Sequence, residues 1–369
     1  MRPEEATERP SALWVTGSGP HADIVISSRI RLARNLAGIP FPHVLSEEGA
    51  EDIVRRVQGA HQALQAEGRL KGYTFVRVDR LPPLDRQVLV EKHLISPQHA
   101  QEAKPTALLI DPEQTVSVMV NEEDHLRIQC LLPGLQLEKA WETANAVDDA
   151  LEEKLDFAFG ERLGYLTACP TNVGTGLRAS VMLHLPALIL TNQAARVGHA
   201  VIKLGLAVRG LYGEGTEALG NMFQVSNQVT LGQTEEEIIH DLRSVTEQLV
   251  GHETNARKLL MSENRSQIED RVNRAYGILA NARIMTSQEA MQLLSDLRLG
   301  VDLDLLRLPR KKTLNELMVV TRPAYLQRLA GGELEPLQRD IRRATMIRGS
   351  LRLVDPPPAG DAGGDQKAR

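Results

Sequence analysis

The sequence predicts an α+β protein in which an antiparallel sheet flanked by helices is followed by a C-terminal helical bundle. Three short runs at 107–110, 115–120 and 126–132 are β-branched or alternate apolar with polar residues, and turn residues separate them, as in an antiparallel meander. Helical spacing occurs on both sides of these runs, and beyond about residue 260 no strand pattern remains. A length of 369 residues is longer than one typical domain and favours two.

The N-terminal region is expected to be a flexible arm over residues 1–20, which are rich in Pro, Gly and Glu, with ordered structure from about Ile24. The first long helix begins after Ser46, a residue type that caps helix N-termini, and ends before Gly68. Between these positions apolar residues such as Ile53 and Val57 recur every three to four residues. This spacing is that of an amphipathic helix.

After the meander, residues 138–159 return to helical spacing, with acidic residues on the opposite face. Further strands are expected at 164–169, 180–188 and 222–231. Thr234 and Glu237 match a capping box, which opens a long helix. We expect this helix to close the first domain.

The C-terminal half reads as helical. Two more capping-box patterns, Thr286 with Glu289 and Thr313 with Glu316, each begin an amphipathic helix. The segment from 355 onward has too little apolar surface to offset the entropy of ordering it. The predicted organisation is therefore a flexible arm at 1–20, a sheet domain at 21–257, a helical domain at 258–354 and a disordered tail at 355–369.

Composition narrows the class of protein and its compartment. The formal net charge of -5 argues against a general nucleic-acid binder, and aromatic residues, at 3%, are too scarce to stack many bases. The two cysteines, Cys130 and Cys169, lack C-x-x-C spacing, which argues against a disulfide framework or a structural zinc site. No signal-peptide core is present, and no apolar stretch approaches the ~18 residues that span a bilayer. We expect a cytoplasmic protein that binds neither membranes nor nucleic acid directly.

The segment 169–179, Cys-Pro-Thr-Asn-Val-Gly-Thr-Gly-Leu-Arg-Ala, lies in a tract without acidic residues that runs from 163 to 213. The tract carries Arg178, Arg196, Lys203 and Arg209, so it predicts a cationic surface with exposed backbone donors, which suits a polyphosphate. Residues 174–179 match the pattern G-x-G-x-x-A, but the acidic residue expected about 20 positions later is missing. A Walker motif is also excluded, because arginine stands at 178. A bound phosphate would therefore be held by arginines.

Two further segments carry groups that suit catalysis. Arg29 and Arg31 are two residues apart, so on a strand they point to one face and can share one ligand; a solvated basic edge is the alternative. Residues 121–127, Asn-Glu-Glu-Asp-His-Leu-Arg, place three acids, a histidine and an arginine at a strand end. Carboxylates there can orient a nucleophile, act as a base or hold magnesium through water; a polar turn is the alternative.

Three single residues remain open on sequence grounds. Cys169 precedes a proline in cationic surroundings that favour a thiolate, although lone cysteines are usually buried apolar residues. Glu214 lies between glycines just after Arg209, on a loop that either closes over a substrate or is solvated. His93 follows an expected helix and is either a nucleotide contact or a surface residue.

Together these segments resemble the phosphagen (guanidino) kinase family, and within it the bacterial protein arginine kinases of the McsB type. The similarity in order and spacing runs from about Ile24 to His240 and rests on the paired arginines, the 121–127 motif, 169–179, and 209–210 with 225–227. Each motif is moderately specific, and jointly they are strong. The resemblance implies the guanidino kinase catalytic fold for 21–257 and a regulatory role for the helical domain.

The resemblance also implies roles for individual residues. Glu123 would be the catalytic base for the guanidinium, Glu122 would help to organise magnesium, Glu214 would be a second guanidinium-binding acid, and Cys169 would lie beside the acceptor nitrogen. Magnesium would be held through ATP without direct ligands from the chain. Contacts with ATP are implied for Ser28, Arg29, Arg31, His93, Arg127, Asn172, Gly174, Arg178, Arg209 and Glu217.

This chain departs from the small-molecule members of that family in two places. Those members carry an additional N-terminal helical domain that helps to enclose a free amino acid, whereas here the shared motifs begin almost at the start. We therefore expect an acceptor site open enough for an arginine on a protein. Gln224, after Phe223, stands where small-molecule members usually have an aspartate, which changes that nucleotide contact.

Residues 339–344, Arg-Asp-Ile-Arg-Arg-Ala, resemble the RDxxRA phosphoarginine-binding motif of protein arginine kinases. On a helix Arg339 and Arg343 share a face, so Asp340 would meet a guanidinium while an arginine meets its phosphate, with Ala344 completing the motif. From spacing alone a surface salt-bridge ladder is the simpler interpretation, and the resemblance favours the binding motif.

The expected function is an ATP- and magnesium-dependent kinase that phosphorylates arginine side chains of proteins. The alternatives are a kinase for free arginine or another small guanidino compound, and a catalytically weak adaptor that binds phosphoarginine. By resemblance, the kinase would act in stress response and mark proteins for Clp-type degradation. Implied partners are a CtsR-like repressor as substrate, an McsA-like zinc-finger activator, a Clp ATPase and a second copy of the chain in a homodimer.

Overall fold

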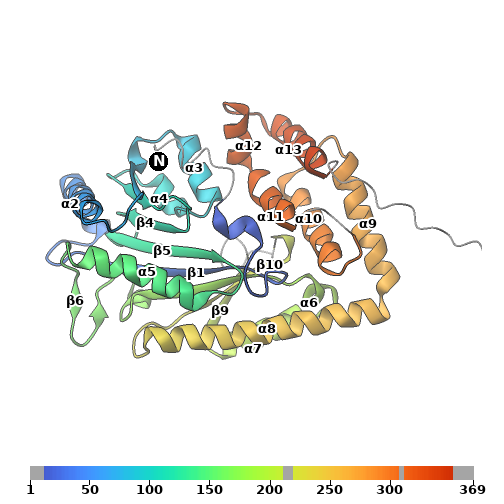
Figure 1. Cartoon of the computed structure of the whole chain (residues 1–369), viewed down its shortest axis with the longest axis horizontal. Coiled ribbons are helices and arrows are strands. Elements are labelled where there is room, and N and C mark those ends of the chain that lie inside the picture. The colour runs from blue at the N-terminus through green and yellow to red at the C-terminus, as the bar shows by residue number, and fades with distance from the viewer. Residues whose placement is uncertain (1–11, 211–218, 307–310, 352–369) are drawn as a thin grey trace, which may run out of the picture.

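The computed structural model describes residues 12–210, 219–306 and 311–351. An eight-stranded antiparallel sheet forms its centre, with helices packed on it and a helical region at one end (Figure 1). The α+β class predicted from the sequence is confirmed. Among the described residues, strands are confined to the part of the chain before α8, as predicted.

The sheet has the strand order β2-β3-β4-β5-β1-β8-β10-β9, and every neighbouring pair is antiparallel. The meander predicted from three short runs is confirmed as β3, β4 and β5. A separate two-stranded hairpin joins β6 and β7. The strands are β1 Val25–Arg34, β2 Thr74–Arg77, β3 Ala107–Ile110, β4 Val116–Val120, β5 Leu126–Pro133, β6 Phe159–Gly160, β7 Gly164–Tyr165, β8 Leu177–His184, β9 Leu206–Gly210 and β10 Met222–Asn227.

Helices connect and cover these strands. The α-helices are α2 Glu47–Ala66, α3 Pro83–Glu91, α4 Pro97–Gln101, α5 Leu137–Glu152, α6 Pro186–Leu190, α7 Ala194–Lys203, α8 Glu235–Glu263, α9 Arg265–Asn281, α10 Ser287–Asp302, α11 Lys311–Val320, α12 Pro323–Ala330 and α13 Pro336–Leu351. Short 3-10 helices are η1 Leu13–Thr16, η2 Pro42–Val44, η3 Val78–Arg80, η4 Pro170–Asn172 and η5 Leu219–Asn221.

One face of the sheet is covered by α2, α5 and α8. Helix α2 contacts β4, α5 contacts β1 and β5, and α8 contacts β8 and β10. Together they bury a common apolar core. Both predicted N-termini are confirmed: the Ser46 hydroxyl accepts a hydrogen bond from the Gly49 N–H, and Thr234 forms the full capping box with Glu237. Burial of Ile30 and Leu32 against this layer fixes the direction of the alternating β1 side chains.

The opposite face is apolar at its ends and polar between them. At the β2–β4 end, α3 and α4 lie over a small apolar cluster that includes Leu89 and Met119. Towards the helical region, Leu131 and Met222 pack in the same cluster as η1, α10, α11 and α13. The central zone carries Arg29 and Arg31, which the pleat turns away from Ile30 and Leu32.

The expected loose arm is wrong for the part of it that the structure describes. Residues 13–16 form η1, in which Trp14 is 5% and Val15 1% exposed. Both pack in one cluster with Leu314 and Leu317 of α11. Apolar residues among Pro and Gly were read as flexible, and only their partners in the helical region show that they are core.

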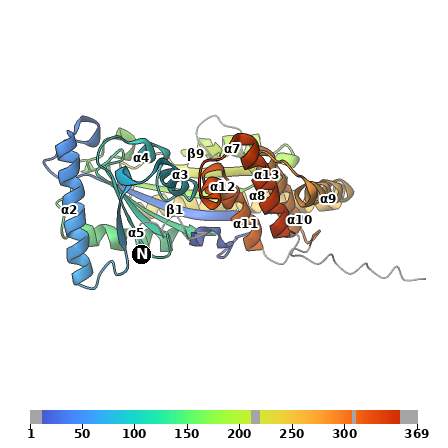
Figure 2. The same cartoon turned by 90° about the horizontal axis from the view of Figure 1, so that it is seen from above.

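The helical region is joined to the sheet domain by side chains as well as by the chain itself. Glu91, at the end of α3, accepts hydrogen bonds from the Ala324 and Tyr325 N–H groups at 2.9 and 2.8 Å, and so caps α12. Helix α8 runs without a break through the expected boundary at 257/258, and α9 turns away from its end (Figure 1). Seen from above, α2 lies at one end of the molecule and α9 at the other (Figure 2).

Several predicted element boundaries are wrong. The helix expected at 138–159 ends at Glu152. Of the later residues in its apolar spacing, Leu155 is buried in a loop, whereas Phe159 is 61% exposed in β6. The strand expected at 164–169 is only Gly164–Tyr165. The strand expected at 180–188 begins earlier, at Leu177, and ends at His184, because Pro186 starts α6.

Two further boundaries differ in the same way. The strand expected at 222–231 ends at Asn227. Thr286 caps α10 as predicted, whereas Thr313 lies inside the first turn of α11. The predicted disordered tail lies outside the described residues. No described helix is both long and apolar enough to cross a bilayer.

Candidate active site

Arginine side chains from four strands share the polar face of the sheet. Arg29 and Arg31 come from β1, Arg127 from β5, Arg178 from β8 and Arg209 from β9. Arg31 lies directly opposite Arg178 in the β1–β8 register. Each charge influences its neighbours, since Arg127 and Arg178 act on Arg29, and Arg209 acts on Arg178. The five arginines expected from scattered segments therefore form one group, the arginine cluster.

Burial and repulsion make the arginine cluster a site for anions. Burial, followed by the charges of Arg127 and Arg178, lowers the pKa of Arg29 to about 10. Burial and the same kind of repulsion lower the pKa of Arg31 well below its usual value. The buried Nε atoms of Arg31 and Arg178 have no hydrogen-bond partner in the described part of the chain. Several negative charges placed here would relieve repulsion and satisfy these donors.

The position of Arg29 is set by two neutral groups. Its Nε donates to the Ser180 hydroxyl at 3.3 Å, and its Nη2 donates to the Gln224 side-chain oxygen at 3.1 Å. Because Gln224 is uncharged, it orients Arg29 without cancelling its charge. Gln224 in place of an aspartate therefore leaves more positive charge in the cluster.

Glu122 is the carboxylate that balances part of this charge. It is 4% exposed, pairs with Arg127 at 2.6 Å and accepts a hydrogen bond from the Ser96 hydroxyl at 2.6 Å. Burial acts to raise the pKa of Glu122, but Arg127, Ser96 and the Glu123 N–H outweigh it and lower that pKa to about 2. Glu122 is thus ionised over the whole physiological range and holds Arg127 in place.

The turn between β4 and β5 carries Glu123 and is tied to the segment that carries Cys169. Asn121 has a positive φ of 60°, which reverses the chain after β4. Asp124 accepts hydrogen bonds from the Asn35 amide at 2.6 Å and from the Ala168 N–H at 2.7 Å, so it ties the turn to the residue before Cys169. Glu123 is half-buried, and both Glu123 and Cys169 lie close enough to Arg178 to influence it electrostatically. The proposed base and the thiol therefore adjoin the arginine cluster.

His125 makes the turn rigid. Its Nδ1 accepts from the Leu36 N–H at 3.0 Å, and its Nε2 lies 2.9 Å from the Pro40 carbonyl, to which it can donate. Both contacts fit a neutral ring. Burial lowers the pKa of His125 to about 4, although the bond to Pro40 opposes this.

The glycines of the 169–179 segment are explained by packing. Gly174 has φ 113°, and a Cβ there would lie 2.3 Å from the Thr230 carbonyl oxygen. The backbone donors of this segment are used internally, since the Thr175 N–H bonds to the Thr230 carbonyl at 3.2 Å and the Asn172 N–H to the Cys169 carbonyl at 3.0 Å. The expectation of exposed backbone donors is wrong for these groups. Cys169 itself is half-buried, with its Sγ 3.0 Å from the Thr171 hydroxyl.

His93 lies beside the arginine cluster and contacts an unexpected neighbour. Its ring meets the Trp14 ring edge-on, with centroids 5.2 Å apart. Both rings line a small cavity with Arg29, Ser180 and other residues of the polar face. Burial, then the charges of Arg322 and Arg29, lower the pKa of His93 well below its usual value. A neutral imidazole next to an indole is an uncharged aromatic wall beside the cationic site.

Not every predicted site residue joins this group. The Ser28 side chain lies on the other face of β1, where it donates to the Gly134 carbonyl and accepts from the Gln136 N–H, both at 2.9 Å. A contact between the Ser28 hydroxyl and the nucleotide is therefore wrong for this arrangement. Glu214 and Glu217 lie outside the described residues. Asn172 belongs to η4, next to Cys169.

The RDxxRA motif lies on α13, but half of it is buried. Arg343 is 1% exposed and donates to the Thr321 and Met285 carbonyls at 2.8 and 2.9 Å as well as to Asp340. Ala344 is fully buried in the helical core. The prediction that Arg343 faces a ligand is therefore wrong for this structure; Arg339 and Asp340 are the partly exposed members.

The sequence analysis did not identify Arg34, which is held on the face of β1 opposite the arginine cluster. Arg34 is 1% exposed, pairs with Asp148 of α5 at 2.6 Å and donates to the Thr175 carbonyl at 3.0 Å. Its guanidinium lies 3.4 Å from the centre of the Tyr165 ring. The signal was present, because Arg34 breaks the alternation that Arg29 and Arg31 begin.

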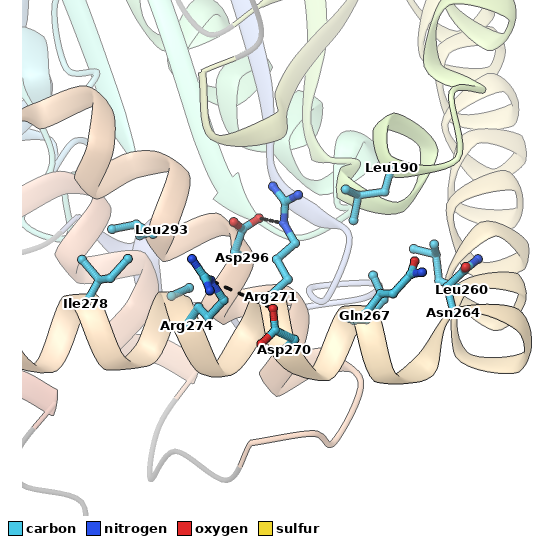
Figure 3. Close-up of a pocket in the computed structure, with 12 residues that line it drawn as sticks. Leu190, Leu260, Asn264, Gln267, Asp270, Arg271, Arg274, Ile278, Leu293 and Asp296 are labelled. Atoms are coloured by element: carbon cyan, nitrogen blue, oxygen red, sulfur yellow. Dashed lines mark ion pairs between the residues drawn. The ribbon is translucent and has the colours of Figure 1, made fainter.

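A cavity of about 510 Å³ lies apart from this site, between α8, α9, α10 and α6 (Figure 3). Its charged residues pair with one another: Arg271 points to Asp296 at 3.0 Å, and Arg274 lies 4.0 Å from Asp270. None of the predicted catalytic or nucleotide-binding residues lines it. We therefore place the active site at the arginine cluster.

Comparison with protein families agrees with this assignment. Residues 52–256 match the model of the ATP:guanido phosphotransferase C-terminal catalytic domain, and residues 265–361 match that of the protein-arginine kinase McsB C-terminal domain. The chain is similar to a lombricine kinase structure, with a TM-score of 0.57 and 25% identity over 65% of this chain and 68% of that one. It is also similar to a taurocyamine kinase from Schistosoma mansoni, with a TM-score of 0.57 and 27% identity over 64% and 34% of the two chains.

Curated relatives cover nearly the whole sequence. A protein-arginine kinase from Moorella thermoacetica is 58% identical over 91% of this chain and 96% of its own length. One from Symbiobacterium thermophilum is 56% identical over 94% and 98%. With the arginine cluster, the adjoining carboxylate and both family models in agreement, the chain belongs to the ATP:guanido phosphotransferase family, as a member of its protein-arginine kinase branch.

Proposed function

We propose that this enzyme transfers the γ-phosphoryl group of ATP to the guanidinium group of arginine side chains in proteins. The observation that carries the proposal is the position of Glu123 and Cys169 at the edge of the arginine cluster. A cationic site that lacks enough carboxylates to balance it suits a polyphosphate, and a carboxylate at its border suits a guanidinium. The names of the relatives support a protein acceptor.

The residues divide the chemistry between them. The arginine cluster would hold the phosphates, with Arg178 of β8 next to Arg31 of β1 on the same face of the sheet. A guanidinium is a poor nucleophile because its charge is delocalised, so Glu123 would align it and accept the proton that leaves as the N–P bond forms. The bond from the γ-phosphorus to the bridging oxygen breaks, and ADP leaves. The cationic surroundings stabilise charge on the transferring group.

Magnesium fits this site through the nucleotide. The described residues contain no cluster of three or more His, Cys, Asp or Glu side chains that could hold a metal ion by themselves. Glu122 and Glu123 are the carboxylates beside the cluster, and Glu122 is already held by Arg127 and Ser96. When bound with ATP, magnesium would neutralise charge on the phosphate oxygens.

The test separates a protein acceptor from a small one. Purified enzyme would be incubated with Mg-ATP and either an arginine-rich protein or free arginine, and phosphoarginine would be detected by acid lability and mass spectrometry. We expect modification of the protein, none of free arginine, and loss of product in Glu123→Ala. Turnover of free arginine would favour a small-molecule kinase. Product in neither reaction, with phosphoarginine binding that is lost in Arg339→Ala/Asp340→Ala, would favour an adaptor.

The wider role remains a proposal based on the family. We propose that the enzyme acts in the cytoplasm in stress response, inactivates a CtsR-like repressor and marks proteins for a Clp ATPase and its protease. An McsA-like zinc-finger activator and a homodimer are proposed on the same basis. The test is copurification with the tagged enzyme from heat-shocked cells. A partner that copurifies would support its proposed interaction, and a partner that does not would contradict it.

A further inference from the structure

A groove of about 430 Å³ is lined by Glu122 and Glu123 and by residues outside the arginine cluster. Its walls are η2 and the start of α2 on one side and α4 with the following loop on the other; the β4–β5 turn and Ala168 close one end. The groove therefore touches both the turn that carries Glu123 and the residue before Cys169. An acceptor at Glu123 that extends beyond its guanidinium can continue into this space.

The groove floor offers an unused hydrogen-bond acceptor. Asn121 is 3% exposed, and its side-chain nitrogen donates to the Ala50 and Pro105 carbonyls, both at 2.9 Å. Those two bonds fix the orientation of the amide. Asn121 lines the groove, and its buried Oδ1 has no hydrogen-bond partner among the described residues. A buried acceptor without a partner costs stability, and an N–H donor in the groove would remove that cost.

The α4 wall adds a negative charge. Glu102 is half-buried and lines the groove, and its Oε1 accepts from the Ala103 and Lys104 N–H groups at 3.1 and 3.2 Å. Lys104, the basic residue of this wall, is held by a bond from its Nζ to the Pro42 carbonyl at 2.8 Å. The groove thus presents an amide oxygen at Asn121 and a carboxylate at Glu102.

The size and chemistry fit a short polypeptide segment. A volume of about 430 Å³ is that of a pocket for a small organic molecule, which corresponds to a few amino-acid residues. Peptide N–H groups supply donors, and a lysine or arginine side chain supplies a positive charge to match Glu102. A free amino acid held at Glu123 would leave most of this groove empty.

We propose that the groove binds the polypeptide next to the acceptor arginine, and that Glu102 makes the enzyme prefer a basic residue there. The proposal rests on the proposed role of Glu123 as the acceptor carboxylate. It assigns substrate selection to Glu102, which directly follows α4 and lies outside the arginine cluster. Glu102 acts on the affinity for the acceptor and leaves the reacting atoms to Glu123.

The experiment compares peptides that carry one arginine and either lysine or glutamate at each of the three positions on both sides. Initial rates would be measured for the unaltered enzyme, for Glu102→Gln and for Glu142→Gln, an exposed carboxylate on α5. Glutamine can still accept from the Ala103 and Lys104 N–H groups, so the loop keeps its conformation. N-acetyl-arginine amide, which is too short to fill the groove, serves as the reference acceptor.

We expect the unaltered enzyme and Glu142→Gln to prefer lysine over glutamate by about three-fold in kcat/KM at one or more positions, since a partly exposed ion pair has that order of strength. Glu102→Gln should lose this preference through KM, with kcat and the rate on N-acetyl-arginine amide unchanged. If Glu102→Gln keeps the same preference for lysine as the unaltered enzyme, or if the unaltered enzyme shows no preference, the groove assignment is wrong and the proposed function is unaffected. Absence of phosphoarginine from every reaction would instead refute the proposed function.

Discussion

Adjacent carboxylates on the β4–β5 turn should fail in different ways when each is changed to glutamine. Glu122 is buried and paired with Arg127, and its pKa is lowered from 4.5 to about 2. A folded-state pKa below the unfolded value means that the ionised group stabilises the fold above pH 4.5 and loses this effect as pH falls through about 2. The shift corresponds to about 3 kcal/mol at neutral pH. Allowing for the partly exposed Arg127, we expect Glu122→Gln to lower the free energy of unfolding by about 2–3 kcal/mol.

Glu123→Gln is the matched control at the next position. The Glu123 side chain is half-buried and forms no ion pair with the described residues. We therefore expect a change within about 0.5 kcal/mol in stability, with a loss of at least about 100-fold in phosphoarginine formation. The assay is urea denaturation at pH 7.5 for the three proteins, followed by turnover of an arginine-rich protein. Equal destabilisation by both changes, or none by Glu122→Gln, would refute the assignment of Glu122 as the balancing charge.

Three further predictions address the nucleotide wall, the turn and the C-terminal motif. In a Trp141→Phe background, ATP or ADP should quench or shift the fluorescence of Trp14, which lines the cavity with His93. An unchanged spectrum at saturating nucleotide would place the adenine ring elsewhere. His125 has a pKa lowered to about 4, so the unfolded state binds more protons between pH 6.5 and 4, and stability falls on acidification. Between pH 7.5 and 5 its contribution should fall by about 2 kcal/mol, and His125→Gln should flatten the pH profile of the urea midpoint accordingly. Arg343→Met should lower the free energy of unfolding by about 2–4 kcal/mol, because it leaves buried carbonyls and Asp340 without their donor; a neutral effect by calorimetry would show that Arg343 is free to serve a ligand.

The fold was largely predictable because its signals are local. The β3–β5 meander follows from alternation and turn residues, and α2 and α8 begin at caps that need only neighbouring residues. Errors arose where a buried loop residue happens to fall at helical spacing. Leu155 continues the spacing of α5 although it belongs to a loop packed on the core.

The candidate site was predictable in its members and less so in its geometry. The pleat of a strand places Arg29 and Arg31 on one face, and the same rule places Ser28 on the other, which family resemblance did not reveal. The resemblance implies an ATP contact for Gly174, and its φ and the nearby Thr230 carbonyl give a packing reason for the glycine that the sequence does not show. These distinctions depend on which strand or loop lies next to each residue.

The sequence by itself determined the element types, the residues that carry charge and the family to which they belong, because these depend on local spacing and residue chemistry. The tertiary structure alone decided which charges meet. Arg127, Arg178 and Arg209 come from strands far apart in the chain, and only the sheet order β5-β1-β8-β10-β9 brings them to one face with Arg29. The same holds for Trp14, which became part of the core through α11, and for the groove that joins η2 to α4 at Glu123. Burial, pKa and cavity shape are properties of non-local packing, so no reading of adjacent residues can supply them.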